Sequence, residues 1–410
     1  MPEVYTDPAD PETPVGQRIQ FFRTRRGMSR VVLGGLVGKS ARWVKAVETG
    51  QLQQPKLPVL LSLAEALHIK DLGQLTGDQS VPVVTFQGPG HPALPAVRDA
   101  VNRVASSMTG PPASREHMKA RIDFAWRARH SSPDHRTVVG ALLPDLIRDA
   151  RYAVRMYEGN DRRHALSLLA QVYNLAQFFI AYQPAADLLW RVAERSVMAA
   201  EESEDPRALG GAVWLLAQAH RDAGDFDAAE AVTRDGLDLL RPHVAEADTD
   251  LRAMWGALHF EAAYTSARAG DAGTAWGWWD KADVIARTLP ASHYDPMTSF
   301  SQVIMGAHAV TIAVETRQAG ESKRQARRSA NSAIPSQPRK GRHLIEIARA
   351  YHLGNDKPAL LGTLRNAYVT APETIRYNGY ARHMILELTE SPEPLRTGAR
   401  TLAEQVGMVS

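Results

Sequence analysis

The 410-residue sequence contains no cysteine, and this absence excludes several kinds of site. A disulfide framework, a Cys-ligated zinc or iron–sulfur centre and a thiol nucleophile all require a thiol side chain. Long apolar runs are also missing, because the N-terminal segment MPEVYTDPADPETPVG is acidic and proline-rich and no later stretch reaches membrane-spanning length. We therefore expect a protein that is not exported, works in the cytoplasm and does not bind a membrane.

Sequence motifs for catalysis are equally scarce. The chain has no GxxxxGK[ST] phosphate loop, no HExxH, no GxSxG and no GxGxxG, and GPGHP at 88–92 is bounded by prolines as a linker would be. We therefore expect a protein that is not an enzyme and that holds no cofactor and no metal.

Charge is unevenly distributed along the chain. The net charge is only +3, but residues 1–14 carry −4, residues 15–77 carry +7, and the remainder is neutral. A small basic module attached to a neutral body is typical of a nucleic-acid-binding protein with an appended domain.

Four segments follow from the pattern of turns and apolar residues. Residues 1–14 are predicted to be a disordered acidic N-terminus, and residues 15–77 to form five short helices that end near Gly27, Gly38, Gly50 and Lys70-Asp71. Residues 78–95 hold four prolines and are predicted to be a linker. From 96 to 410 the apolar residues recur at helical spacing, so the predicted fold class is all-α.

The segment SRVVLGGLVGKSARWVKAVETG, residues 29–50, has the features of a helix-turn-helix. Gly34 is the small residue where two helices would cross, Gly38 suits a left-handed turn, and Ser40 is placed to cap the second helix. Four apolar residues would pack between the two helices: Leu33, Val37, Val44 and Val47.

Together with flanking helices predicted at 15–26 and 57–67, this segment resembles the phage-repressor or Xre type of helix-turn-helix domain. The resemblance includes the Glu48-Thr49-Gly50 exit and the Pro55-Lys56 loop, whereas Lys39 stands where an apolar residue is usual and Arg30 where a glutamine is usual. The alternative is a degenerate helix-turn-helix kept for protein contacts, which the +7 charge disfavours.

The resemblance implies which residues would touch double-stranded DNA. The predicted base-reading positions are Ala41, Arg42, Lys45 and Ala46, and the predicted phosphate contacts are Arg30, Lys39, Ser40 and Lys56. Arg42 is the main candidate, because a guanidinium matches the O6 and N7 acceptors of guanine. Trp43 is expected to pack at the edge of the helical core or on the sugar backbone.

Repeats are visible in the body of the chain. AGDFDAAEAVTRDGLDLL at 223–240 and AGDAGTAWGWWDKADVIA at 269–286 share a Gly-Asp pair and two small residues at the same offsets. Related segments recur 43 to 46 residues apart, which predicts an α-solenoid of stacked helix pairs. The segments resemble tetratricopeptide repeats, although their spacing exceeds the usual period of about 34 residues. The alternative is a non-repetitive helical bundle.

Alignment of these repeats on their Gly-Asp turns projects ten residues toward a concave face. They are Gln171, Asn174, Trp214, Gln218, Arg221, Phe260, Tyr264, Arg268, Arg317 and Arg349. Amides, aromatic rings and arginines would suit a short anionic or C-terminal peptide, or an anionic metabolite. The alternative is an inner face that is polar only because water wets it.

One basic run in the body allows two interpretations. Residues 323–343 include seven lysines and arginines that could form a second DNA or phosphate contact. Because Ser332, Pro335, Ser336 and Pro338 interrupt the run, we expect a solvated loop instead.

The predicted domain order resembles that of the RRNPP peptide-sensing regulators of Gram-positive bacteria and of actinobacterial Xre–tetratricopeptide regulators. The resemblance implies a homodimer that binds an operator and senses a peptide or small molecule. The alternative function is a DNA-binding scaffold or antitoxin-like protein whose repeats dock a partner protein.

Overall fold

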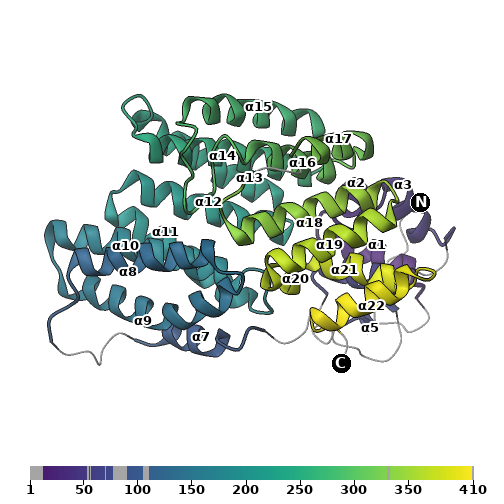
Figure 1. The fold of residues 1–410 in the computed structure, drawn as a ribbon, viewed down its shortest axis with the longest axis horizontal. Helices are drawn as coiled ribbons and strands as arrows, with labels where there is room; N and C mark the ends of the chain where they lie inside the picture. The colour runs from purple at the N-terminus through teal and green to yellow at the C-terminus, as the bar shows by residue number, and fades with distance from the viewer. Residues whose placement is uncertain are drawn as a thin grey trace.

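A computed structural model describes residues 13–52, 55, 57–69, 71–76, 90–104, 110–329 and 333–408. The segment 1–12, Lys56 and most of the predicted linker lie outside these ranges. Within them the fold is all-α, as the sequence predicts, with a helix-turn-helix domain followed by a solenoid of helices (Figure 1). None of the described helices is both long and apolar enough to cross a lipid bilayer.

The N-terminal domain has short helices separated by glycine turns. Its helices are α1 (Val15–Arg25), α2 (Arg30–Leu36), α3 (Ala41–Glu48), α4 (Leu57–Ala66) and α5 (Gly73–Thr76). Gly27, Gly38 and Gly50 have φ values of 65°, 68° and 72°, which glycine adopts without the strain that a side chain would add. These turns lie where the sequence places them.

The body contains longer helices. In chain order they are α7 (Leu94–Asn102), α8 (Arg115–Ser131), α9 (His135–Met156), α10 (Gly159–Ile180), α11 (Ala186–Ser203), α12 (Pro206–Ala223), α13 (Phe226–Leu240), the short η1 (Arg241–His243), α14 (Thr249–Arg268), α15 (Ala272–Thr288), α16 (Met305–Glu315), α17 (Ala319–Ser329), α18 (Gln337–Leu353), α19 (Lys357–Thr370), α20 (Pro372–Tyr377), α21 (Gly379–Thr389) and α22 (Leu395–Gln405). From α8 to α19, consecutive helices pack in pairs. Helix α7 begins inside the segment 78–95 that the sequence assigns to a linker.

The Gly-Asp pairs are the turns within two of these helix pairs. Gly224 and Gly270 adopt left-handed φ values of 81° and 90° after α12 and α14. The carboxylates of Asp225 and Asp271 then cap α13 and α15 by accepting hydrogen bonds from backbone amides three residues on. One residue pair therefore ends one helix and begins the next.

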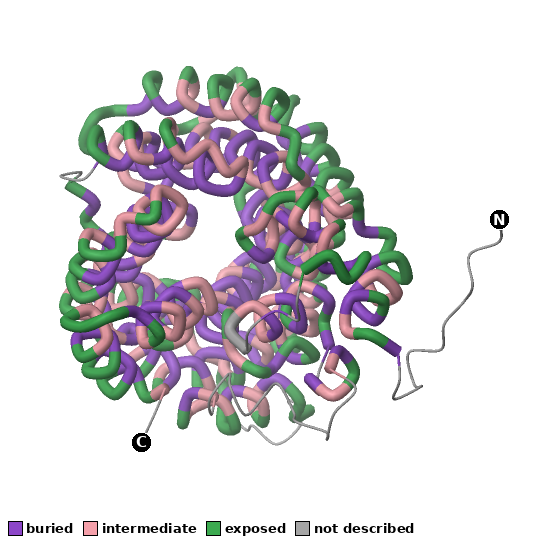
Figure 2. Tube along the Cα trace, turned by 90° about the vertical axis from the view of Figure 1, so that its right-hand side faces the viewer, coloured by how far each residue is buried: buried purple, intermediate pink, exposed green. Residues whose placement is uncertain are grey.

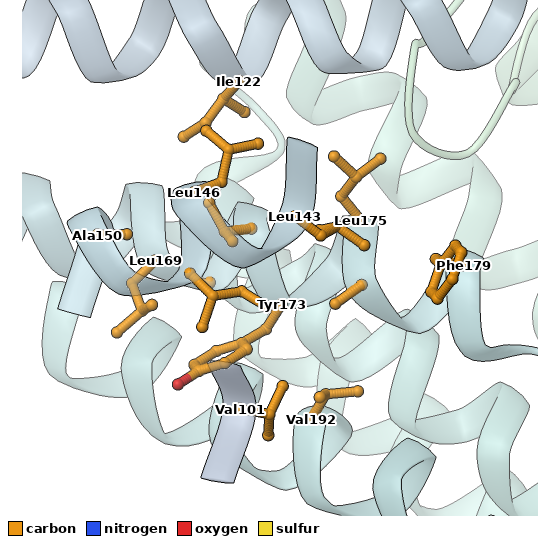
Figure 3. Close-up of a cluster of buried hydrophobic side chains, with 14 of the residues drawn as sticks. Val101, Ile122, Leu143, Leu146, Ala150, Leu169, Tyr173, Leu175, Phe179 and Val192 are labelled. Carbon is orange, nitrogen blue, oxygen red and sulfur yellow. The ribbon is translucent and has the colours of Figure 1, made fainter. Parts of the chain in front are cut away.

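Small and apolar residues hold the pairs together. Gly256 on α14 lies so close to the ring of Phe300 that a Cβ atom there would be 2.2 Å from the ring. In the first repeats, the buried side chains of Ile122, Leu143 and Tyr173 belong to one apolar cluster that joins α8, α9 and α10 (Figure 3). Burial of this surface is the main source of stability for stacked helix pairs.

The basic run at 323–343 is not the solvated loop that the sequence suggested. Its first part belongs to α17 and its last part to α18. Ser336 caps α18 by accepting from the Arg339 amide, and Pro338 occupies the first turn, where a proline is tolerated. The serines and prolines that suggested a loop therefore include the start signal of a helix, and Arg339 and Arg342 face inward instead of toward solvent.

The solenoid closes on itself. Figure 2 shows the Cα trace running around a central region. Glu373 on α20 accepts hydrogen bonds from the Arg136 amide at 2.5 Å and from the Thr137 hydroxyl at 2.6 Å, both at the start of α9. His130 at the end of α8 also bonds Ser336 at 2.7 Å. The last repeats thus meet the first ones.

The helix-turn-helix domain docks against this ring. Helix α4 packs on α21, and α2 packs on α14. The His68 imidazole is hydrogen-bonded to the Ala223 carbonyl, and the Arg317 guanidinium donates to the Gly34 carbonyl at 3.2 Å. The helix-turn-helix domain and the helical body therefore share an interface.

We expect Glu373→Ala to lower the free energy of unfolding by about 1–3 kcal/mol, because it leaves buried amides at the start of α9 without an acceptor. Urea denaturation measures the loss, and amide hydrogen exchange should locate it at the junction of α9 and α20. Glu404→Ala on the exposed face of α22 is the matched control. Equal stability of the two variants would show that the ring does not depend on this contact.

Candidate DNA interface and central cavity

The helix-turn-helix motif is built around the contact between α2 and α3. A Cβ atom on Gly34 would lie 2.7 Å from the Lys39 carbonyl oxygen, so only glycine allows the two helices to approach this closely. The Ser40 hydroxyl accepts a hydrogen bond from the Trp43 amide at 3.1 Å, which confirms the predicted cap. All four predicted apolar residues between the helices are buried: Leu33, Val37, Val44 and Val47.

The predicted base-reading residues lie along one side of α3. Arg42 and Lys45 are exposed and are three residues apart, so they project from the same face of the helix. Ala41 and Ala46 beside them are half-buried. An exposed arginine and lysine on the second helix of the motif can reach a major groove.

The predicted phosphate contacts have mixed surroundings. Ser40 is exposed, and Lys56 lies outside the described residues. Lys39 is half-buried and lines two hollows where the helix-turn-helix domain meets the helical body. In the smaller hollow a hydrogen bond with His352 lowers the pKa of Glu387 to about 2, and the charges of His352, His383 and Lys39 reinforce the shift. Lys39 therefore faces the helical body as well as α3, since its ammonium group lies 5.8 Å from the Trp43 ring.

Arg30 belongs to an ion-pair cluster that the sequence reading missed. The Glu48 carboxylate is buried and accepts from Arg23 at 2.5 Å and from Arg30 at 2.6 Å. Arg23 also donates to the Met28 carbonyl at 2.7 Å. One carboxylate on α3 thus joins α1 and α2. From the sequence the Glu48-Thr49-Gly50 segment predicts only the exit from the motif, because sequence spacing does not show which arginines the carboxylate meets.

A cavity of about 400 Å³ lies at the centre of the ring. Eight of the ten residues projected onto a concave face line it: Trp214, Gln218, Arg221, Phe260, Tyr264, Arg268, Arg317 and Arg349. Seven of them come from α12, α14 and α18, and Arg317 comes from the turn between α16 and α17. The inward helices are the first members of successive pairs, as the repeat alignment predicts.

Gln171 and Asn174 are not among the cavity-lining residues. Asn174 is buried between α10 and α11, where its side-chain oxygen accepts from the Ser196 hydroxyl at 2.7 Å and its nitrogen contacts the Met297 sulfur at 3.4 Å. The repeat alignment is wrong for Asn174, because other helices and the loop that holds Met297 enclose this part of α10. Gln177 and Phe178, one turn further on, reach the cavity instead.

Several arginines of the cavity wall are paired with buried carboxylates. Arg221 bonds Glu261, and Arg349 bonds Glu315 at 2.7 Å. Arg221 also lies 4.1 Å from the centre of the Tyr264 ring, and Arg349 lies 3.7 Å from that of Tyr380. These pairs neutralise part of the wall and hold the guanidinium groups in place.

Other arginines of the wall lack such carboxylates at hydrogen-bonding distance. Arg129 lies over the Phe178 ring at 4.2 Å, and burial lowers its pKa to about 10. Burial also lowers the pKa of Arg339, whose Nη2 approaches His308 at 3.1 Å. The sequence reading did not single out Arg129, and it assigned Arg339 to a loop. The wall is therefore more positive than the projected residues alone indicated.

Two histidines beside these arginines are held neutral. Burial, reinforced by Arg129, lowers the pKa of His130 to about 4. Burial and the neighbouring Arg136 lower the pKa of His135 to about 2. A cavity wall that already carries several positive charges disfavours another.

These histidines predict loss of stability in acid. Because the pKa of His130 lies below its ordinary value of 6.5, the unfolded chain binds more protons than the folded chain as the pH falls from 6.5 toward about 4. We expect the urea midpoint to fall over that range. His130→Asn should reduce the fall, whereas His117→Asn on the exposed side of α8 should not. An unchanged pH profile in His130→Asn would contradict the assignment.

The Glu48 cluster predicts a local loss of stability. Glu48→Gln leaves the Arg23 guanidinium without its anionic partner, and loss of one partner of a buried pair costs about 3–5 kcal/mol. We expect faster amide exchange in α1, α2 and α3 but not in α10, measured by mass spectrometry. Glu194→Gln on the exposed face of α11 is the control. Unchanged exchange in α1–α3 would mean that Glu48 does not hold the motif together.

The comparisons with known proteins agree with the geometry of the N-terminal domain. None of the curated proteins matches the chain. Residues 15–72, which span α1 to α4, match a family model described as a helix-turn-helix domain. The chain therefore carries a helix-turn-helix domain, which is typical of DNA-binding regulators.

Proposed function

We propose that this protein is a sequence-specific transcriptional regulator of the Xre type that binds a signal in its central cavity. One observation carries the proposal. The cavity is lined both by the helical body and by the helix-turn-helix domain, which contributes Leu36, Lys39 and Glu65. A ligand there would contact both domains at once, so its binding energy would depend on how the DNA-binding domain is docked.

The signal is a peptide terminus or a small molecule, and the protein acts by binding and not by catalysis. Its tetratricopeptide-like repeats place aromatic rings and arginines around a cavity whose volume of about 400 Å³ is in the range of small-molecule pockets. The alternative, a scaffold that docks a partner protein, would not need these groups inside the ring. A scaffold would respond only to a protein, whereas a sensor responds to a small ligand or peptide.

DNA binding in this proposal uses two copies of the chain. Helix-turn-helix domains of this kind read paired half-sites about one helical turn apart, so a homodimer would place two α3 helices in successive major grooves. The exposure of Arg42 and Lys45 supports contact between α3 and a major groove.

The experiment begins with selection of preferred sites from random duplex DNA by the full-length protein. On the selected site, Arg42→Ala should lose about 1–3 kcal/mol of binding free energy and tolerate any base at one position. Arg127→Ala, which removes an exposed arginine from α8, is the control. Failure to select any sequence would refute the proposal, and equal weakening on selected and random DNA would reduce Arg42 to a phosphate contact.

A further inference from the structure

Glu65 is a carboxylate that the DNA-binding domain contributes to the cavity. It lies on α4, and its Oε1 atom is 3.1 Å from where a Cβ atom of Gly379 on α21 would be. The charged groups that act on it come from the facing helices: Arg268 at the end of α14 attracts it, and Asp222 at the end of α12 repels it. Glu65 is solvent-exposed where it lines the cavity, and partial desolvation by the surrounding protein raises the pKa of its carboxyl group.

The cavity wall also holds buried polar atoms that lack hydrogen-bond partners among the described residues. These include the Nε atoms of Arg136 and Arg339 and the indole nitrogen of Trp214. The Nε atom of Arg268 also makes no hydrogen bond to the described residues, although it lies 3.8 Å from the buried Glu315 carboxylate. Arg136 and Trp214 are 6% and 8% exposed, and all four residues line the cavity. Buried donors without acceptors are rare in proteins, so this set marks a place for a ligand that supplies acceptor oxygens.

Flat apolar surfaces accompany these donors. The rings of Phe178 and Trp214 lie 6.1 Å apart, and Phe260 stacks on His308 with ring centres 3.4 Å apart. Aromatic surfaces favour a planar apolar ligand, while guanidinium groups favour a carboxylate. Inorganic phosphate would use only the second of these features.

We propose that the cavity binds a small aromatic carboxylate, and that this carboxylate competes with Glu65 for the positive field around Arg268. The proposal rests on the proposed function and adds the ligand class and the residue that couples the two domains. In the ligand-free protein, Glu65 places a negative charge near the arginines. A bound carboxylate repels Glu65 and so weakens the docking of α4 on α21, which changes the position of α3.

The test is calorimetric titration of the full-length protein with three probes: benzoate, 4-hydroxyphenylacetate and indole-3-acetate. Each probe is compared with its uncharged amide and with inorganic phosphate. We expect at least one carboxylate to bind at least tenfold more tightly than its amide and than phosphate. Equal binding of acid and amide, preference for phosphate, or no binding by any of the three carboxylates would overturn the proposed ligand class.

Glu65→Gln tests the competition directly. It removes a competing negative charge, so the best carboxylate should bind at least fivefold more tightly, whereas Glu194→Gln on the outer face of α11 should leave the affinity unchanged. A Glu65→Gln affinity equal to or weaker than that of the unmodified protein would overturn the role of Glu65.

Arg268→Gln tests the positive field around the ligand. We expect this variant to bind the best carboxylate at least tenfold more weakly than the unmodified protein does. The control variant Arg127→Gln should bind the same carboxylate with unchanged affinity. Glu315 keeps its 2.7 Å bond to Arg349 in this variant, and a thermal melt verifies that the ring is folded. If Arg268→Gln does not fold, Arg339→Gln takes its place with the same expected loss. Unchanged affinity in a folded variant would overturn the assignment.

The DNA measurement separates this inference from the proposed function. The carboxylate should change the affinity of the unmodified protein for its selected DNA site at least threefold, and Glu65→Gln should abolish that change. If no DNA site can be selected while the carboxylate binds and Glu65→Gln strengthens its binding, the regulator proposal fails and the ligand assignment stands. If DNA binds normally and is insensitive to a bound carboxylate, the coupling through Glu65 is refuted and DNA recognition stands.

Discussion

The contact between Glu373 and the start of α9 is the constraint on which the central cavity depends. An open solenoid presents its inner helices to solvent, but here residues 236 and 237 positions apart are hydrogen-bonded, so the last repeats meet the first. A carboxylate beside the first turn of a helix also interacts favourably with the helix dipole. The closed ring surrounds the inner face with protein, and the arginines and aromatic rings on that face become the wall of one cavity.

Closure also explains the unusual electrostatics of the wall. Arginines on an open concave surface would be solvated, whereas in the ring Arg221 and Arg349 are buried and bound to Glu261 and Glu315. Such pairs contribute little to stability, because desolvation offsets much of their attraction. Other guanidinium groups, such as that of Arg129, have no carboxylate among the described residues at hydrogen-bonding distance. The lowered pKa of His130 reflects its burial first and the nearby charge of Arg129 second.

The helix-turn-helix domain is part of the same assembly. Its α4 and α2 helices pack against the ring, while Arg42 and Lys45 on α3 stay exposed. A rigid connection between the Glu48 cluster and the α4 surface would transmit a change at the cavity to α3, since α1, α2 and α3 are joined through one buried carboxylate.

The sequence by itself determined the features that depend on neighbours a few residues apart. Ser40 caps α3, Gly38 takes a left-handed turn, and each Gly-Asp pair ends one helix and starts the next, because these hydrogen bonds join residues within about one helical turn. Alignment of the repeats on their Gly-Asp turns likewise placed Trp214 and Arg268 on the inner face. Only the tertiary structure decided that Asn174 is enclosed between helices, that Arg339 faces inward, and that Glu65 and Glu373 meet distant partners. Those outcomes depend on the rotation between successive repeats, which accumulates around the ring. Small differences in helix packing therefore add up over hundreds of residues, and local sequence signals do not encode them.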